Sequence, residues 1–122
     1  MELEDIGKQV VDAAITVHRE LGPGLLESAD EQCLAFELAR RDLKVERQEE
    51  LPLIHQGMKI DVGYRIDLLV GNQVIVELKA AERIEPIHNA QLISYLKLSG
   101  LHLGYLINFN VRLLRDGLHR VV

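Results

Sequence analysis

The stretch YRIDLLVGNQVIVELKA, residues 64–80, constrains the fold more than any other part of the sequence. Two runs of Ile, Leu and Val meet at a Gly-Asn pair, which is typical of a β-hairpin with buried strands. Asp67, Glu77 and Lys79 interrupt these apolar runs. Burying a charge is costly unless the charge is paired or holds a metal ion. The charged residues of the hairpin therefore predict either a structural ion pair or a metal-binding or catalytic site.

The register of this hairpin decides whether its two carboxylates meet. Alternate residues of a strand share one face of the sheet. A two-residue turn at Gly71-Asn72 would place the carboxylates on opposite faces, whereas a three-residue turn or one bulge would place them on the same face. Because bulges often lie beside active sites, we predict one here and expect Asp67 and Glu77 to share a face.

The composition fits one folded domain over residues 1–122. The chain is 48% hydrophobic, with a mean hydropathy of +0.04. No apolar run reaches the roughly 18 residues of a membrane span, and the first residues, MELEDIGKQV, are too acidic for a signal or transit peptide. The single Cys33 precludes an internal disulfide and suits a reducing compartment. We therefore expect a cytoplasmic protein with no membrane association.

The charge distribution is uneven. The net charge of −5, taken alone, argues against a nucleic-acid-binding protein. Residues 1–50 carry 13 acidic and 6 basic side chains, but residues 51–122 carry 6 acidic and 8 basic ones. The hairpin thus lies in the mildly basic part, which permits a phosphate-bearing ligand without requiring one.

Hydrophobic periodicity predicts the order α-α-β-β-β-α-β-β, an α/β fold with a mixed central β-sheet flanked by helices. Ser28 and Glu31 have the spacing of a capping box, which predicts the start of the second helix, and Pro86 suits the first turn of the third. The second helix is expected to present apolar positions at Cys33, Leu34, Phe36 and Leu38. The expected helices span about 3–20, 28–41 and 86–99. An extended segment is expected at 43–56, the hairpin at 64–79, and the last strands at 101–109 and 116–122.

On a shared face, two carboxylates and an ammonium group would converge on a dry surface. Like charges so placed raise the pKa of one carboxyl strongly, unless a cation lies between them. A hard divalent ion such as Mg²⁺ or Mn²⁺ fits Asp67 and Glu77, with the backbone carbonyl of Leu78 as a further ligand. Lys79 would then hold a water molecule or a phosphate oxygen, an arrangement that suits phosphodiester hydrolysis. The structural alternative is that Lys79 pairs with one of these acids where the strands emerge into solvent.

Asp67, followed by Glu77-Leu78-Lys79, resembles the signature of the PD-(D/E)XK nucleases, with Ile66 at the position where the signature has Pro. Gln91 and Tyr95 match the Q-x-x-x-Y element of RecB-like members. The resemblance implies a restriction-endonuclease-like core and metal-dependent cleavage of DNA.

A more specific resemblance, to the GxxExxY protein family of the same superfamily, covers nearly the whole chain. It is carried by LGPGLLES at 21–28, the hairpin, NAQLISYLKLSGLHLGYLINFNV at 89–111 and DGLHRVV at 116–122. Gly24 and Glu27 match the family's motif, but Asp30 stands where the motif has Tyr. The family pattern implies that Glu27 is an additional metal ligand, whereas its structural alternative is an exposed acid favoured by a helix N-terminus. Asp30 removes an aromatic ring while offering a further carboxylate.

Gln91 and Tyr95 share a helix face with His88. In the functional interpretation, Gln91 orients a water molecule or a phosphate near Lys79, and Tyr95 touches the nucleic-acid backbone. In the structural interpretation, this face is a polar helix edge with Tyr95 half-buried. His88 is either an acid or base, or a solvated histidine of the first turn.

The leading functional hypothesis is a Mg²⁺-dependent deoxyribonuclease. Arg65, Arg83 and Lys97 are candidate phosphate contacts, although ordinary surface charge is the favoured explanation for them. The alternative is a catalytically inactive binding or assembly module with a nuclease fold, and a third hypothesis is hydrolysis of a small phosphoester. A domain of this size offers little surface for holding a DNA duplex, which is compatible with a homodimer or a protein partner. The apolar segment LHLGYLINF could form an edge strand available for pairing or a central strand of the sheet.

Overall fold

The computed structural model describes residues 1–122. The helices are α1 (Leu3–Leu21), α2 (Glu27–Arg40) and α3 (Pro86–Ser99), with a short 3₁₀ helix η1 (Leu114–Asp116). The strands are β1 (Val45–Glu50), β2 (Leu53–His55), β3 (Met58–Ile60), β4 (Arg65–Val70), β5 (Val74–Lys79), β6 (Leu103–Asn108) and β7 (Leu118–Val121). None of the helices combines the length and the apolar character that a membrane crossing requires.

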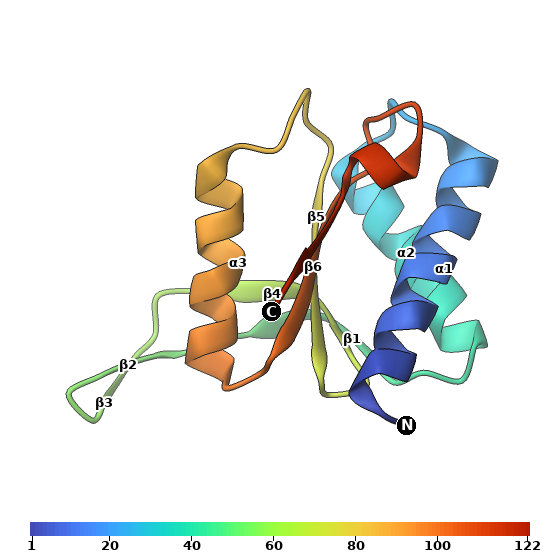
Figure 1. Cartoon of the computed structure of the whole chain (residues 1–122). Coiled ribbons are helices and arrows are strands. Elements are labelled where there is room, and N and C mark those ends of the chain that lie inside the picture. Colours follow the sequence, from blue (N-terminus) through green and yellow to red (C-terminus); the bar gives the residue numbers. More distant parts are fainter.

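Five strands form one mixed sheet in the order β1-β4-β5-β6-β7, in which only β5 and β6 run parallel to each other. Figure 1 shows α1 and α2 on one face of this sheet and α3 on the other. A core of 19 buried residues lies on the α1–α2 side, and a smaller one of 8 lies under α3. The predicted α/β class and the order of the elements of the main sheet are confirmed.

Helix α1 packs an apolar stripe on the sheet, as its periodicity predicted. The residues of this stripe are at most 5% exposed and are Ile6, Val10, Ala13, Ala14 and Val17. The helix ends where the Gly22 N–H donates to the carbonyl of His18, 2.8 Å away. Gly22 has a φ of 70°, a conformation that glycine adopts without strain.

Helix α2 differs from the prediction at its start and on its apolar face. Its N-cap is Leu26, and Ser28 lies inside the helix, so the predicted capping box does not form. The buried face carries Leu34 and Leu38, but Phe36 is 70% exposed. Phe36 was assigned to the core because it is apolar, yet its position turns it away from the sheet.

The extended segment predicted at 43–56 divides into two strands. β1 joins the main sheet, whereas β2 pairs with β3 in a separate two-stranded sheet. This small hairpin projects from the body of the molecule below α3 in Figure 1. It was not predicted, because strands of three residues each are too short to display a period of two. Pro52 lies between β1 and β2.

The C-terminal half follows the prediction closely. Pro86 is the first residue of α3, and Gly100 ends the helix in the left-handed conformation with a φ of 75°. All six residues of β6 are buried, and β6 lies between β5 and β7. The segment LHLGYLINF therefore occupies the interior of the sheet and provides no edge for pairing.

The turn between β4 and β5 contains three residues, Gly71, Asn72 and Gln73. Gly71 and Asn72 have φ values of 59° and 57°, the left-handed region that glycine and asparagine tolerate best. A Cβ atom on Gly71 would lie 2.7 Å from Cδ1 of Ile6. The turn therefore fits closely against α1 as well as setting the hairpin register.

We predict that Gly71→Ala lowers the free energy of unfolding by about 1–3 kcal/mol, because alanine is strained at this φ and its methyl group would press on Ile6. The neighbouring change Asn72→Gly keeps the backbone conformation accessible and should shift stability by less than about 1 kcal/mol. Urea denaturation measures both. Equal destabilisation by the two substitutions would contradict the close fit at Gly71.

Candidate active site

The hairpin register places Asp67 and Glu77 opposite each other. The last ladder pair before them joins Leu68 to Val76, so the next residue along each strand falls on one shared face. The register is the one that the expected shared face requires, and a three-residue turn produces it rather than the predicted bulge.

At Asp67 the backbone ladder between β4 and β5 ends, and carboxylates take its place. The Asp67 N–H donates to Oε2 of Glu77 at 2.7 Å. The Leu78 N–H donates to Oδ2 of Asp67 at 2.9 Å. Each carboxylate thus accepts a hydrogen bond from the backbone of the facing strand, which fixes both acids in position.

The ladder on the other flank of β4 is interrupted at the same point. β1 pairs with β4 on both sides of Gln48, but Gln48 itself, with a φ of 53°, has no ladder partner. Its side-chain amide instead donates to Oδ1 of Asp67 at 3.2 Å and to Oε1 of Glu31 at 2.7 Å. Asp67 therefore lies in a break in the sheet, with side chains on both flanks.

Glu31 supports this break from α2. It is 6% exposed and accepts two hydrogen bonds from Arg47, at 2.9 and 3.2 Å, in addition to the bond from Gln48. The sequence analysis gave Glu31 a capping role and did not identify Gln48. Both roles arise from contacts between α2 and β1, which no local spacing reveals.

Helix α3 closes the site from the other face of the sheet. Tyr95 is 5% exposed, and Nε2 of Gln91 donates to its hydroxyl oxygen at 3.1 Å. Burial raises the pKa of Tyr95, and the charges of Glu77 and Asp67 raise it further. Tyr95 therefore lies within electrostatic reach of the carboxylates, and Gln91 contacts Tyr95.

A family comparison identifies this arrangement. Residues 4–121 match the family model described as the PD-(D/E)XK nuclease superfamily. The chain belongs to this superfamily. Its sheet and helices are therefore a restriction-endonuclease-like core, as predicted. Neither the curated proteins nor the solved structures contain a significant match.

In this PD-(D/E)XK protein, the surrounding residues alone stabilise the ionised forms of the two carboxylates poorly. Glu77 is 4% exposed; its burial, followed by the charge of Asp67, raises its pKa to about 8. Burial also raises the pKa of Asp67, although the Leu78 N–H and Lys79 act in the opposite direction. A divalent cation would offset both effects, because it favours the ionised forms.

Glu27 lies at the exposed start of α2, within electrostatic reach of Lys79 and Asp67. Partial desolvation raises the pKa of Glu27, and Lys79 lowers it. No group of three or more His, Cys, Asp or Glu side chains forms a ready-made metal centre. The structure thus fixes two of the predicted acidic ligands, Asp67 and Glu77, and leaves Glu27 at the margin of the site.

Lys79 ends β5 opposite Asn108 of β6. The Asn108 side chain, 1% exposed, accepts the Ala81 N–H at 3.1 Å and donates to the Ala81 carbonyl at 2.8 Å. It thereby fixes the chain just beyond Lys79. The sequence analysis missed this role, although LINFN places an amide at the end of an apolar strand, where a buried polar residue needs an explanation.

Two predicted phosphate contacts are already engaged by acids. Arg65 lies 3.6 Å from Glu50, and Arg83 lies 2.8 Å from Glu85. Nδ1 of His88 accepts the Glu85 N–H at 3.0 Å, so this histidine supports the start of α3, in agreement with its structural interpretation.

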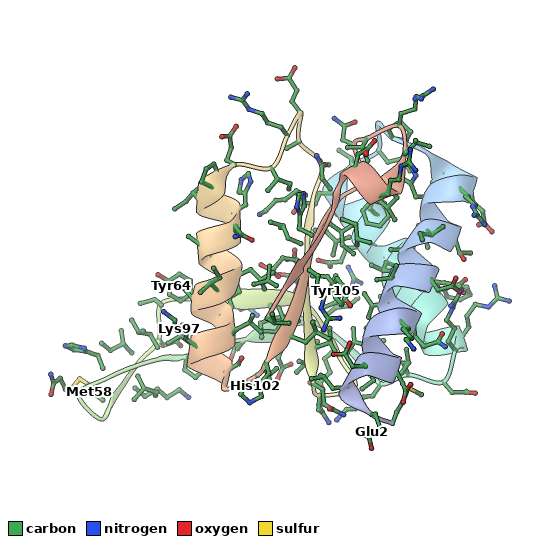
Figure 2. The ribbon with its side chains drawn as sticks, in the orientation of Figure 1. Glu2, Met58, Tyr64, Lys97, His102 and Tyr105 are labelled. Carbon is green, nitrogen blue, oxygen red and sulfur yellow. The ribbon has the colours of Figure 1, made fainter.

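Lys97 instead lines a groove along α3 that also contains Gln91 and Tyr95 and has a volume of about 670 Å³. The Tyr64 ring stands across this groove, with its centroid 6.0 Å from that of Tyr95. Figure 2 shows Tyr64 and Lys97 together beside α3, next to the projecting hairpin. This groove extends the site along the α3 face.

Asp30, at the position where the GxxExxY family has Tyr, lies inside the molecule rather than at the carboxylate pair. It is 2% exposed, and its Oδ1 atom has no hydrogen-bond partner. Burial raises its pKa, and His18 acts in the opposite direction. Asp30 therefore faces α1 and makes no contact that would assign it to the site.

The raised pKa of Glu77 predicts how stability depends on pH. Between its ordinary pKa of 4.5 and the folded-state pKa of about 8, the folded protein holds a proton that the unfolded chain releases. This stabilisation is complete below about pH 4.5 and is lost as the pH rises to about 8. The free energy of unfolding of metal-free protein should therefore fall by about 1 kcal/mol per pH unit across this range.

Glu77→Gln, which stays neutral, should flatten this dependence, while the exposed control Glu82→Gln should retain it. Urea denaturation at several pH values in the presence of a chelator measures the slopes. The same slope in the parent protein and in Glu77→Gln would contradict the assignment.

Proposed function

We propose that this protein hydrolyses phosphodiester bonds in DNA with the help of a divalent cation, Mg²⁺ or Mn²⁺. The observation that carries the proposal is the facing pair of carboxylates, Asp67 and Glu77, held in a break of the sheet with Lys79 on the same strand as Glu77. Membership of a nuclease superfamily supports it.

The available oxygen atoms suit a hard divalent ion. Oε2 of Glu77 accepts a backbone N–H, which leaves Oε1 without a protein donor. Oδ1 of Asp67 accepts only the bond of 3.2 Å from Gln48. Such carboxylate oxygens are the ligands that Mg²⁺ and Mn²⁺ prefer. Asp67 and Glu77 would hold the ion, with the Leu78 carbonyl and Glu27 as further ligands. When bound, the ion lowers the pKa of its water and stabilises negative charge on the phosphoryl group.

Groups of the chain itself would position the reactants. Lys79 would hold a phosphate oxygen or the attacking water beside the carboxylates. The amide N–H of Gln91 donates to Tyr95, so its amide oxygen remains free to accept a hydrogen bond from that water and orient it. The exposed Arg65 would contact the DNA backbone at the edge of the site by exchanging its ion pair with Glu50, and the buried Tyr95 would act through Gln91.

We further propose that the chain is a member of the GxxExxY family. Gly24 and Glu27 keep the first two positions of its motif, and the buried Asp30 departs from the third. The free Cys33 is compatible with the reducing cytoplasm, where we expect the protein to act, alone, as a homodimer or with a protein partner.

A second candidate function is a catalytically inactive binding module with the same fold. Two observations favour it: no three-ligand metal centre is preformed, and a pKa of about 8 keeps Glu77 mostly protonated at neutral pH without an ion. Thermal unfolding separates the candidates, because an intact site gains stability from Mn²⁺ and an abandoned site does not.

Lys79→Ala tests the proposed chemistry. With Mg²⁺ or Mn²⁺ and single-stranded, duplex or branched DNA, the substitution should lower kcat/KM by about 100-fold or more, because positive charge at the phosphate is lost. The control Lys44→Ala removes an exposed lysine paired with Glu46 and should leave cleavage unchanged. Parental activity in Lys79→Ala, or cleavage that needs no divalent ion, would overturn the assignment.

A further inference from the structure

A positively charged groove lies outside the carboxylate site. It has a volume of about 510 Å³ and is bounded by the C-terminal end of α1, the Gly22-Pro23 turn and the segment around η1. Arg19, Arg112 and Arg115 line it together, although α1 and η1 belong to opposite ends of the chain. Figure 1 shows the η1 segment, in red, beside the end of α1.

These three arginines are the only ones in the chain without an acidic partner. The other six arginines each form at least one ion pair. Arg19, Arg112 and Arg115 are exposed, and no Asp or Glu lines their groove. In a protein with a net charge of −5, the groove is therefore a local cluster of positive charge without an ion-pair partner.

The wall of the groove is rigidly supported. Nε2 of His18 lies 2.8 Å from the Val111 carbonyl, and the His18 ring packs against Phe109 with a centroid separation of 6.1 Å. His18 is 7% exposed and Phe109 is 1% exposed. These contacts join α1 to the 109–115 segment, so the arginines are brought together by the fold itself.

The same segment is attached to the strand that carries Lys79. The Phe109 N–H donates to the Lys79 carbonyl at 3.0 Å, and two residues separate Phe109 from Arg112. The groove thus lies at the end of the sheet where the parallel strands β5 and β6 finish, which is also the end of β5 that carries Glu77 and Lys79.

We propose that this groove binds the phosphodiester backbone of the DNA strand whose scissile phosphate lies at Asp67 and Glu77. The inference rests on the proposed nuclease function. Guanidinium groups form paired hydrogen bonds with phosphate oxygens, and contacts of this kind hold a strand in place without reading its sequence. Because Arg65 and Arg83 are already paired, the groove supplies the unpaired guanidinium groups that the carboxylate site lacks.

The triple substitution Arg19→Gln, Arg112→Gln and Arg115→Gln tests the groove. Binding of fluorescein-labelled single-stranded and duplex DNA is followed by anisotropy in EDTA, so that no cleavage occurs. We expect affinity at low salt to fall by about tenfold or more, and the slope of log K against log salt to decrease by about 2 for single strands and about 3 for duplex. Circular dichroism confirms that the exposed substitutions leave the fold intact.

The matched control is the triple substitution Lys8→Gln, Arg40→Gln and Lys44→Gln, which removes the same charge from exposed positions outside the groove. It should retain parental affinity and nearly the parental salt slope. An equal loss of DNA affinity in the two triple variants would overturn the assignment of the groove, because the change in net charge alone would then explain the loss. Competition by polyglutamate as strong as that by DNA would overturn the choice of ligand in favour of an acidic protein.

Cleavage assays separate this inference from the proposed function. The groove variant should cleave bis(p-nitrophenyl) phosphate at the parental rate but show a raised KM for long DNA. If the parent cleaves DNA and the groove variant binds DNA as the parent does, the groove assignment fails alone. If the parent cleaves nothing in Mg²⁺ or Mn²⁺ while the groove variant still loses affinity, the nuclease proposal fails and the groove remains a DNA-binding site.

Discussion

The carboxylates of the buried Glu77 and the half-buried Asp67 replace backbone hydrogen bonds where β4 and β5 separate, and the rest of the site depends on this replacement. A backbone N–H left unpaired inside a protein costs free energy. Asp67 and Glu77 accept hydrogen bonds from the backbone N–H groups that have no partner in the β-ladder, so the break in the sheet is compatible with a stable fold. The same hydrogen bonds favour the ionised carboxylates, while burial opposes ionisation. The carboxylates therefore compensate for the missing ladder bonds, and a bound cation would favour the ionised form of both.

The sequence was sufficient for those features that depend on neighbouring residues. Because alternate residues of a strand share a face, an odd number of turn residues was enough to predict that Asp67 and Glu77 lie on the same face. Pro86 and Gly100 likewise marked the two ends of α3. Features that depend on distant contacts were missed. The role of Glu31 arises where α2 meets β1, and the arginine groove joins the two ends of the chain. Phe36 was misplaced because its apolar character says nothing about the direction in which its helix turns it.

An acidic protein that acts on a polyanion must concentrate positive charge locally. This chain keeps most of its arginines in ion pairs and leaves three unpaired in one groove. Lys79 and a divalent ion would provide the remaining positive charge at the reacting phosphate. The segment that follows β6 connects the two regions through the Phe109–Lys79 hydrogen bond, so a strand bound in the groove would be held by the support that also positions the site.

The most direct test of the account is the location of a bound Mn²⁺ ion. Crystals grown or soaked with Mn²⁺ and measured for anomalous scattering should show a peak coordinated by the carboxylates of Asp67 and Glu77, and crystals of Asp67→Asn should lack it. The absence of density between these carboxylates at saturating Mn²⁺, or a peak confined to another part of the surface, would contradict a metal-binding role for the break in the sheet.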